Sequence, residues 1–352
     1  MLRTETFPSD RQPHIDDHRV LHRRYNTAIF ADDYDSLQAA VDAGAAQGIP
    51  GVLLNPAGHY ELTQTLTVPP EVYLDGGGRS ITSYAPTPRI RAEIVTDAAL
   101  DPMIQLGYFA GITGCLVNGN RVARGAVYCK DVGYNHITDN LIARCVDYGL
   151  KFGGSLFPTI KRNYIYGIEG IGLDALRPYG DTGYYGINVG LSERNEYGGG
   201  TRAAMRVEGI LTSIADDFEG ACNGEARVQV GAGNVASTLT MYAPYFELTS
   251  GNGPAYAIRI GNSSSLILRD GKAYGDVNDP DAIFLDGGLV DTLVVEGMEI
   301  SRFATVFACA LAWHSNLVIA GNRYADATTI NAIRNYDVAQ SRLCVWPGVH
   351  ID

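Results

Sequence analysis

Six carboxylic acids stand close together in the middle of the 352-residue chain and could do acid–base chemistry. They are Asp174, Asp181, Glu208, Asp216, Asp217 and Glu219. Hydrolysis of a glycosidic bond needs one protonated carboxylic acid and one ionised carboxylate, roughly 5 to 9 Å apart. The residue types therefore favour a glycoside hydrolase, and we predict these catalytic residues: Asp174, Glu208, Asp181, Asp217 and Glu219.

Three basic residues support a different chemistry in the same part of the chain. In a lyase, Lys or Arg removes the proton next to a uronate carboxylate, and a cation stabilises the resulting enolate. Lys151, Arg206 and Arg259 could serve in this way. Calcium would be a cofactor only of such a lyase, and the acidic stretch DVNDPD at 276–281 lacks the form of a known calcium loop. We otherwise predict no metal and no cofactor.

The stretch GLDALRPYGDTGYYG at 172–186 is rich in groups that bind sugars. Tyrosine rings stack on sugar faces and their hydroxyls form hydrogen bonds, while Arg and Asp side chains can fix the orientation of a substrate. We predict these substrate-binding residues: Lys151, Arg177, Tyr179, Tyr184, Tyr185, Arg206 and Arg259. The alternative is a loop that only packs over its own solenoid or a neighbouring subunit.

Eight similar segments predict the structure that positions these residues. Each segment ends in a turn residue, and the turn residues, 22 to 32 positions apart, are Asn140, Asn163, Asn195, Asp217, Pro244, Gly271, Met298 and Asn322. Short strands repeated at this period, without helical periodicity between them, indicate a solenoid of parallel β coils. The hairpin turns that a β-propeller or sandwich needs are scarce. The longest interval, Asn163 to Asn195, places 172–186 in a loop beside the coil.

The strand that follows each turn is expected to present a row of exterior side chains. Alternation with period 2 points Val127, Leu150, Leu173, Met205, Val228, Ile258 and Ile283 inward, and Tyr128, Lys151, Asp174, Arg206, Gln229, Arg259 and Phe284 outward, with Lys130, Glu208 and Asp286 further along the outer surface. A row of mixed charges with aromatic ends suits an extended, hydroxyl-rich or acidic polymer. The alternative is a solvated row whose charges neutralise one another.

Glu219 stands where other repeats carry an apolar or aromatic residue, such as Ile165 or Tyr197. Either the register slips by one residue and Phe218 points inward, or a carboxylate is directed into a crowded site. The sequence leaves both possibilities open.

An amphipathic helix is expected at about 33–47, with Leu37, Ala40, Val41, Gly44 and Ala45 on one stripe. This helix, the segments GVLLNPAGHYEL and LTVPPEVYLDGGG, and repeats containing DNLI, RNYI and GNRY resemble the pectin-lyase-like family, in particular the pectate-lyase-3-like domains of phage tailspikes and bacterial glycan-active enzymes. The resemblance implies an all-β, right-handed parallel β-helix whose open end is capped by the helix. It also implies a homo-oligomer, often a trimer.

The stretch HIDDHRVLHRRYN at 14–26 is similar to the start of many phage tail proteins. We therefore expect an N-terminal arm at 1–31, a β-helix domain at 32–345 and a C-terminal tail at 346–352. The first residues are polar and basic, so we expect no Sec signal peptide, synthesis in the cytoplasm and, by the resemblance, a place in a virion tail after lysis.

Composition excludes several partners. The formal net charge of −12 argues against binding to nucleic acid, which needs clustered Lys and Arg. The apolar run VFACALAW is only 8 residues long, whereas a membrane span needs about 20, so no membrane insertion is expected. The scattered cysteines Cys115, Cys129, Cys145, Cys222, Cys309 and Cys344 are expected to be buried thiols, with neither disulfide nor zinc spacing.

These observations predict a tailspike-like depolymerase that binds a bacterial surface polysaccharide and hydrolyses it with paired carboxylates. A uronate lyase with a Lys or Arg base is one alternative. A non-catalytic glycan-binding tail fibre or adhesin is another, and an epimerase or glycosyl transferase on the same fold is a third, because a fold does not determine a function.

Overall fold

The structure is a computed structural model. It describes residues 28–78, 91–176, 186–198, 202–222, 225–231, 235–251, 256–276, 278–325, 332–334 and 342–345. The expected N-terminal arm and C-terminal tail lie outside these residues, apart from the last few residues of the arm. The expected boundaries of the domains therefore stay predictions.

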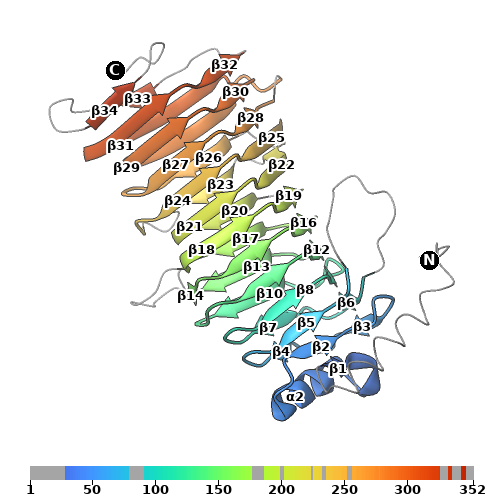
Figure 1. Ribbon diagram of the computed structural model, residues 1–352. Helices are drawn as coiled ribbons and strands as arrows, with labels where there is room; N and C mark the ends of the chain where they lie inside the picture. Colours follow the sequence, from blue (N-terminus) through green and yellow to red (C-terminus); the bar gives the residue numbers. More distant parts are fainter. Residues whose placement is uncertain are drawn as a thin grey trace, which may run out of the picture.

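The described chain winds into a right-handed parallel β-solenoid of about 10 turns, and each turn adds one strand to each of three faces (Figure 1). All strand pairings are parallel and join neighbouring turns. The first face consists of β4 (Leu66–Val68), β7 (Ile104–Leu106), β10 (Gly125–Lys130), β13 (Tyr148–Gly153), β17 (Ile171–Ala175), β20 (Ala203–Val207), β23 (Ala226–Val230), β26 (Tyr256–Ile260) and β33 (Ala332–Arg334).

The second face follows the first along the chain. It consists of β1 (Ile29–Phe30), β2 (Gly51–Leu53), β5 (Tyr73–Asp75), β8 (Gly111–Thr113), β11 (His136–Thr138), β14 (Ser155–Leu156), β15 (Thr159–Lys161), β18 (Ile187–Glu193), β21 (Gly209–Ile214), β24 (Thr238–Tyr242), β27 (Ser265–Arg269) and β34 (Arg342–Val345). Two long strands, β29 (Ile283–Glu296) and β31 (Thr305–Ala320), run from the first face onto the second.

The third face is a separate 11-stranded sheet. It consists of β3 (His59–Glu61), β6 (Glu93–Val95), β9 (Leu116–Asn118), β12 (Leu141–Ala143), β16 (Tyr164–Tyr166), β19 (Glu196–Gly198), β22 (Asp217–Cys222), β25 (Tyr245–Ser250), β28 (Lys272–Tyr274), β30 (Glu299–Ser301) and β32 (Arg323–Ala325). Only β22 and β25 have six residues, so the sheet is widest at that turn of the solenoid.

A helix covers the N-terminal end of the solenoid. The short 3-10 helix η1 (Ala31–Asp33) precedes α2 (Leu37–Gln47), which lies against β1, β2 and β4. The expected start near residue 33 is wrong, because Ser36 adopts extended backbone and its hydroxyl accepts a hydrogen bond from the Ala39 N–H as an N-cap. Leu37, Ala40, Val41 and Gly44 are buried as expected, whereas Ala45 is exposed.

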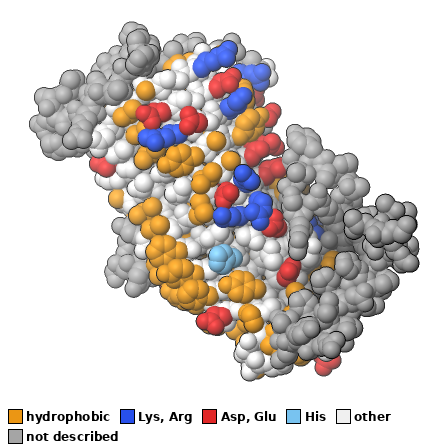
Figure 2. All heavy atoms as spheres, in the orientation of Figure 1, with side chains coloured by type: hydrophobic (Ala, Val, Ile, Leu, Met, Phe, Trp, Pro, Cys, Tyr) orange, Lys and Arg blue, Asp and Glu red, His pale blue; other side chains and the backbone are white. Residues whose placement is uncertain are grey.

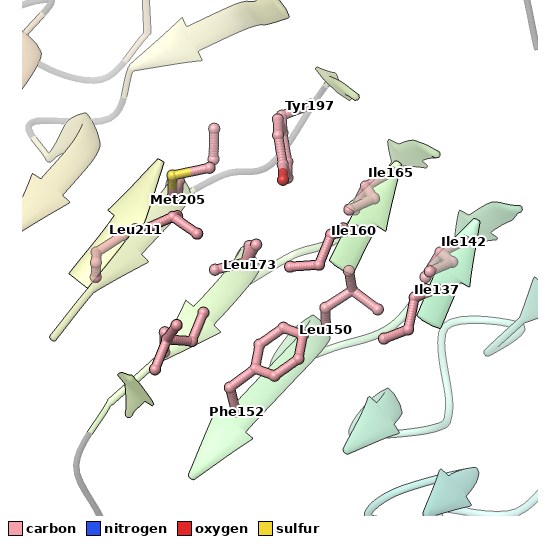
Figure 3. Packing of buried hydrophobic residues seen from close by; sticks show 14 of the residues in the cluster. Ile137, Ile142, Leu150, Phe152, Ile160, Ile165, Leu173, Tyr197, Met205 and Leu211 are labelled. Atoms are coloured by element: carbon pink, nitrogen blue, oxygen red, sulfur yellow. The ribbon is translucent and has the colours of Figure 1, made fainter. Parts of the chain in front are cut away.

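The core is a set of ladders, since equivalent inward residues of neighbouring turns stack about 4.8 Å apart. Figure 3 shows Leu150, Leu173 and Met205 of the first face facing Ile165 and Tyr197 of the third. All five are at most 1% exposed. The predicted inward ladder is confirmed from Val127 to Ile258. It continues to Leu285 rather than Ile283, so the expected outward residue Phe284 is wrong: its ring is buried and Asp286 takes the outward place.

The turn between the second and third faces carries a ladder of buried amides. The side-chain oxygen of each ladder residue accepts a hydrogen bond from a backbone N–H of the preceding turn: Asn140 from Cys115 at 3.0 Å, Asn163 from Asn140 at 3.0 Å, and Asn195 from Asn163 at 2.9 Å. Asp216 ends the series, accepting from the Asn195 N–H at 2.7 Å. These bonds satisfy backbone donors that would otherwise be buried without a partner.

The ladder corrects one of the predicted turn positions. Asp216, not Asp217, occupies the turn, because Glu196 pairs with Asp217 and Tyr197 pairs with Phe218. The register therefore slips by one residue, which is one of the two possibilities that the sequence left open. As a result, Phe218 points inward and Asp217 and Glu219 point outward.

Candidate functional site

The first-face row is the set of outward residues predicted from the sequence, with Asp286 in place of Phe284. Strand pairing aligns Tyr128, Lys151, Asp174, Arg206, Gln229, Arg259 and Asp286 on successive turns. The row thus brings together four of the predicted site residues: Lys151, Asp174, Arg206 and Arg259.

Asp174 and Arg206 form a closed, two-pronged ion pair in the middle of this row. The Arg206 guanidinium donates from Nε to one carboxylate oxygen and from a terminal nitrogen to the other, both at 2.9 Å. The side chains are only 10% and 20% exposed. Arg259 forms a more exposed pair with Asp286, with 2.9 Å between Nε and Oδ2. Each carboxylate therefore holds a cation instead of presenting a free oxygen to a substrate.

Lys151 lies over aromatic rings at the edge of the same row. Its ammonium nitrogen is 5.2 Å from the centre of the Tyr128 ring and 5.0 Å from that of Tyr148. The Tyr148 hydroxyl in turn donates to Asp101 at 2.6 Å. These cation–π contacts hold the ammonium group against the two rings.

Glu208 follows β20 and is buried, at 3% exposure, so it does not stand in the exposed row. Its backbone N–H bonds to Ala175 and its carbonyl accepts from Ile187, which places it where the chain leaves for the stretch 177–185. The predicted residues in that stretch lie outside the described residues: Arg177, Tyr179, Asp181, Tyr184 and Tyr185.

Four carboxylates gather on the third face, and we call Glu196, Asp217, Glu219 and Glu247 the acidic cluster. Asp217 and Glu219 alternate with the inward Phe218 on β22, so both point outward from one strand. Glu196 on β19 pairs with Asp217, and Glu247 on β25 pairs with Glu219. The cluster thus spans three neighbouring turns about 4.8 Å apart.

The electrostatics of the cluster favour a carboxyl group that keeps its proton. Burial, followed by the negative charges of Glu219, Glu196 and Glu247, raises the pKa of Asp217 to about 7. Burial and Glu247 also raise the pKa of Glu219. Oδ1 of Asp217 is buried without a hydrogen-bond partner in the described part of the chain. A carboxyl group of this kind is typical of a general acid.

Aromatic stacking inside the solenoid holds the cluster in place. The Phe218 ring stacks on Tyr197 at 5.3 Å and on Phe246 at 4.9 Å. Arg227, fully buried, donates to the backbone carbonyls of Tyr197 and Glu219. These contacts hold the Phe218 ring and the Glu219 carbonyl in place. They thereby position the outward side chains of Asp217 and Glu219 on β22.

Tyrosines flank the acidic cluster along the axis of the solenoid. Tyr164 and Tyr166 lie on β16, one turn before Glu196, with their ring centres 5.7 Å apart. On the other side, the rings of Tyr245 and Tyr274 are 5.8 Å apart. The Tyr245 hydroxyl donates to Glu247 at 2.9 Å. Tyr166 is exposed and the other three tyrosines are half-buried, so the carboxylates lie between aromatic residues that sugar rings could contact.

Asp217 and Glu219 were predicted from the sequence, whereas Glu196, Glu247 and the four tyrosines were not. The predicted outward row lies on the first face, and on the third face only the inward residue of each strand was assigned. The signal was available in NEY, where Glu196 directly precedes the inward ring of Tyr197, and in YFE, where Tyr245 and Glu247 stand on either side of the inward ring of Phe246. Aligning these segments in the corrected register would have placed Glu196 beside Asp217.

A third surface is apolar, and we call Phe109, Tyr134, Phe157, Val189 and Ile210 the aromatic band. These residues lie at the corner between the first and second faces and are 40% to 46% exposed. The Tyr134 ring stacks on Phe109 at 4.8 Å and on Phe157 at 5.2 Å. Figure 2 shows hydrophobic side chains running as a continuous band along this margin. Because the rings cover one another, they present mainly their edges to solvent.

The described residues give little support for a metal site or for a reactive cysteine. No group of three or more His, Cys, Asp or Glu side chains there is arranged to hold a metal ion. The absence of a cofactor stays a prediction. The thiols of Cys115, Cys129, Cys145 and Cys309 are free and buried, as expected. No described helix has the length and apolar character that a membrane span requires.

Comparisons with known proteins agree with this architecture. No family model matches the chain, and no curated protein does. ORF18 of Geobacillus virus E2 is similar in structure, with a TM-score of 0.55 and 16% identity over 94% of this chain and 63% of that chain. PfbA, a surface adhesin of Streptococcus pneumoniae, gives a TM-score of 0.57 and 10% identity over 92% of this chain and 97% of that chain. The feature that this chain shares with both structures is the right-handed parallel β-helix fold.

The Dettilon tailspike protein is a further similar structure, with a TM-score of 0.46 and 12% identity over 86% of this chain and 69% of that chain. At identities of 10% to 16%, structural similarity shows the fold alone. The chain spans about 63% of the length of the Geobacillus virus protein, so that protein has a further part to which this chain has no counterpart in the match.

Proposed function

We propose that the protein binds a polysaccharide on its third face and hydrolyses it at the acidic cluster. The observation that carries the proposal is the raised pKa of Asp217, about 7, beside three other carboxylates and between two pairs of tyrosines. At neutral pH this group holds a proton for much of the time. A polymer laid across the tyrosines would bring a glycosidic bond to it.

In the proposed reaction, Asp217 donates its proton to the glycosidic oxygen as the bond from that oxygen to the anomeric carbon breaks. Glu219 removes a proton from the water that attacks the anomeric carbon, and the products are two shorter chains, one with a new reducing end. The two residues are attached about 6.6 Å apart along the strand, from a rise of 3.3 Å per residue. Because water attacks directly and no covalent glycosyl-enzyme intermediate forms, the proposed reaction inverts the configuration of the anomeric carbon.

The first-face row supports a uronate lyase less well. Arg206 is committed to Asp174, Arg259 to Asp286, and Lys151 to two aromatic rings. A lyase base has to reach the proton next to the uronate carboxylate, and these contacts already occupy all three basic groups. The row is better suited to bind an acidic or hydroxyl-rich polymer than to deprotonate one.

A non-catalytic adhesin is the second candidate function. It is favoured by the match to PfbA, which covers nearly the whole of both chains and is described as a surface adhesin. In that case the tyrosines and charged rows would retain a glycan, and the acidic cluster would have no chemical role.

We further propose a homo-oligomer, with three copies as the resemblance to tailspikes implies, and a place in a virion tail. The structural similarity to a protein of Geobacillus virus E2 and to a tailspike supports this setting. The polysaccharide would then belong to the surface of a bacterial host.

Incubation of the purified protein with a panel of capsular, exopolysaccharide and uronate-containing polymers tests the proposal. Reducing ends and the absorbance of unsaturated uronate are followed in parallel. We expect new reducing ends without absorbance. Both signals together would establish a lyase and contradict the proposal, and retention of a glycan without either signal would establish the adhesin.

A further inference from the structure

The ladder of buried amides changes its chemistry at the turn that carries the acidic cluster. Three successive ladder residues are Asn140, Asn163 and Asn195, and the fourth is Asp216. An amide at this position already satisfies the backbone of its neighbours. The carboxylate is therefore not required to build the ladder, and it stands directly before Asp217.

Asp216 is fully buried and tightly held. Its Oδ1 accepts hydrogen bonds from the N–H of Asn195 at 2.7 Å and from its side-chain amide at 3.1 Å. Its Oδ2 accepts from the Ser213 hydroxyl at 2.7 Å, and a hydrogen bond from Ser192 also favours the ionised form. Burial acts against these bonds, and the pKa of Asp216 rises to about 6. At neutral pH the group is therefore mostly an anion.

A buried anion affects its neighbours strongly, because little water screens its charge. Asp216 faces the interior of the solenoid and Asp217 faces outward, joined by one peptide bond. The negative charge of Asp216 is one of the causes that raise the pKa of Asp217. It also raises the pKa of Tyr197, the ring below the cluster.

We propose that Asp216 is a positioning residue: its buried carboxylate anchors the chain in the ladder directly before β22 and holds a negative charge behind Asp217. The inference rests on the proposed function, because it assigns Asp216 a role in maintaining the acid that protonates the glycosidic oxygen. It adds a residue that touches neither substrate nor water.

Other groups that face Asp216 and Asp217 also affect the pKa of Asp217. Asp217 faces Glu196 on β19, Glu219 on its own strand and Glu247 on β25. Asp216 faces Tyr197, Ser192 and Ser213. The carboxylates of the cluster raise the pKa of Asp217 whether residue 216 is Asp or Asn, so the substitution removes one contribution and leaves the rest.

The test is the substitution Asp216→Asn, which copies the residue used at three other ladder positions. The amide oxygen can still accept from Asn195, and the Ser213 hydroxyl can turn to accept from the new amide. The carboxyl carbons of Asp217 in the full chain are followed by NMR during a pH titration. We expect the titration midpoint of Asp217 to fall to lower pH, and the alkaline limit of any hydrolysis to move in the same direction.

Asp139→Asn is the matched control, since it removes one carboxylate from the same corner of the solenoid, three turns away, where Asp139 pairs with Arg162. It should leave the midpoint of Asp217 in place. An unchanged midpoint in folded Asp216→Asn would overturn the inference.

If Asp216→Asn fails to fold, the wild-type titration decides. Asp217 should then titrate in two coupled steps, one of which coincides with the titration of Asp216, whereas a single independent step would overturn the inference. The titration needs no substrate. If the protein hydrolyses no polymer but the two titrations are coupled, the proposed function is contradicted. The inference that the buried charge of Asp216 acts on Asp217 would still hold.

Discussion

The first-face row and the acidic cluster are both built from outward residues of parallel strands, yet their charges are arranged in opposite ways. In the row, each acid lies beside a base of a neighbouring turn: Asp174 beside Arg206, and Asp286 beside Arg259. In the cluster, an acid meets an acid: Asp217 beside Glu196, and Glu219 beside Glu247. An acid beside a base forms an ion pair, whereas neighbouring acids raise the pKa values of one another.

The largest expected effect is on hydrolysis. Asp217→Asn removes the proton donor and should reduce the rate of reducing-end formation by about 10² to 10⁴, the usual contribution of a general acid. Asp286→Asn is the matched control on the first-face row, and we expect it to stay within about twofold of wild type because it only opens an exposed ion pair. Equal losses in both variants would mean that the two regions do not differ in chemistry.

A smaller effect on rate is expected for Tyr245→Phe. The substitution removes the hydroxyl that donates to Glu247 and keeps the ring. Loss of one hydrogen bond to a charged group is worth about 1.5 to 3 kcal/mol, so we expect about a tenfold to hundredfold slower reaction if Glu247 has to stay ordered. Tyr256→Phe on the first face serves as the control, and a rate equal to wild type in both would exclude Glu247 from the site.

On the first face, we expect substitutions in the ion pairs to lower the stability of the fold rather than the rate of hydrolysis. Arg206→Met leaves the nearly buried Asp174 without its partner and should cost about 2 to 4 kcal/mol in the free energy of unfolding. Arg259→Met opens the more exposed pair and should cost about 1 kcal/mol or less. Denaturant titrations of the two variants measure the difference, and an equal cost would show that burial does not separate the pairs.

The pH dependence of stability should also reveal the raised pKa values at the acidic cluster. The pKa values of Asp216 and Asp217 are raised from 3.8 to about 6 and about 7. The folded state therefore binds protons more tightly than the unfolded state, and this stabilisation is complete below about pH 4 and lost as the pH rises through 6 and 7. Asp217→Asn, which is always neutral, should unfold at the same temperature as wild type at pH 4 and at a higher temperature at pH 8. A variant that is less stable at both pH values would contradict this sign.

Much of the fold could be predicted from the sequence, because a β-solenoid repeats its signals. The turn residues, the inward ladder from Val127 to Ile258 and the capping helix all depend on local patterns. Errors arose where a pattern depends on the neighbouring turn. From the sequence alone, Phe284 was predicted to point outward. The pairing of Arg259 on β26 with Asp286 on β29 sets the register and turns Phe284 inward.

The candidate site was harder to predict for the same reason. Asp217 and Glu219 could be named as acids, but their orientation depends on whether residue 216 or 217 enters the ladder. That choice is decided by Asn195, whose N–H reaches Asp216, and by stacking of Phe218 between Tyr197 and Phe246. Glu196 and Glu247 join the cluster only through strand pairing, which no single segment encodes.

The most direct test is a crystal structure of Asp217→Asn with an oligosaccharide of the polymer that wild type cleaves. The slow variant should trap intact substrate. We expect a sugar chain across the third face between Tyr164 and Tyr245, with a glycosidic oxygen beside residue 217. A chain lying along the first-face row, over Lys151 and Arg206, would contradict it.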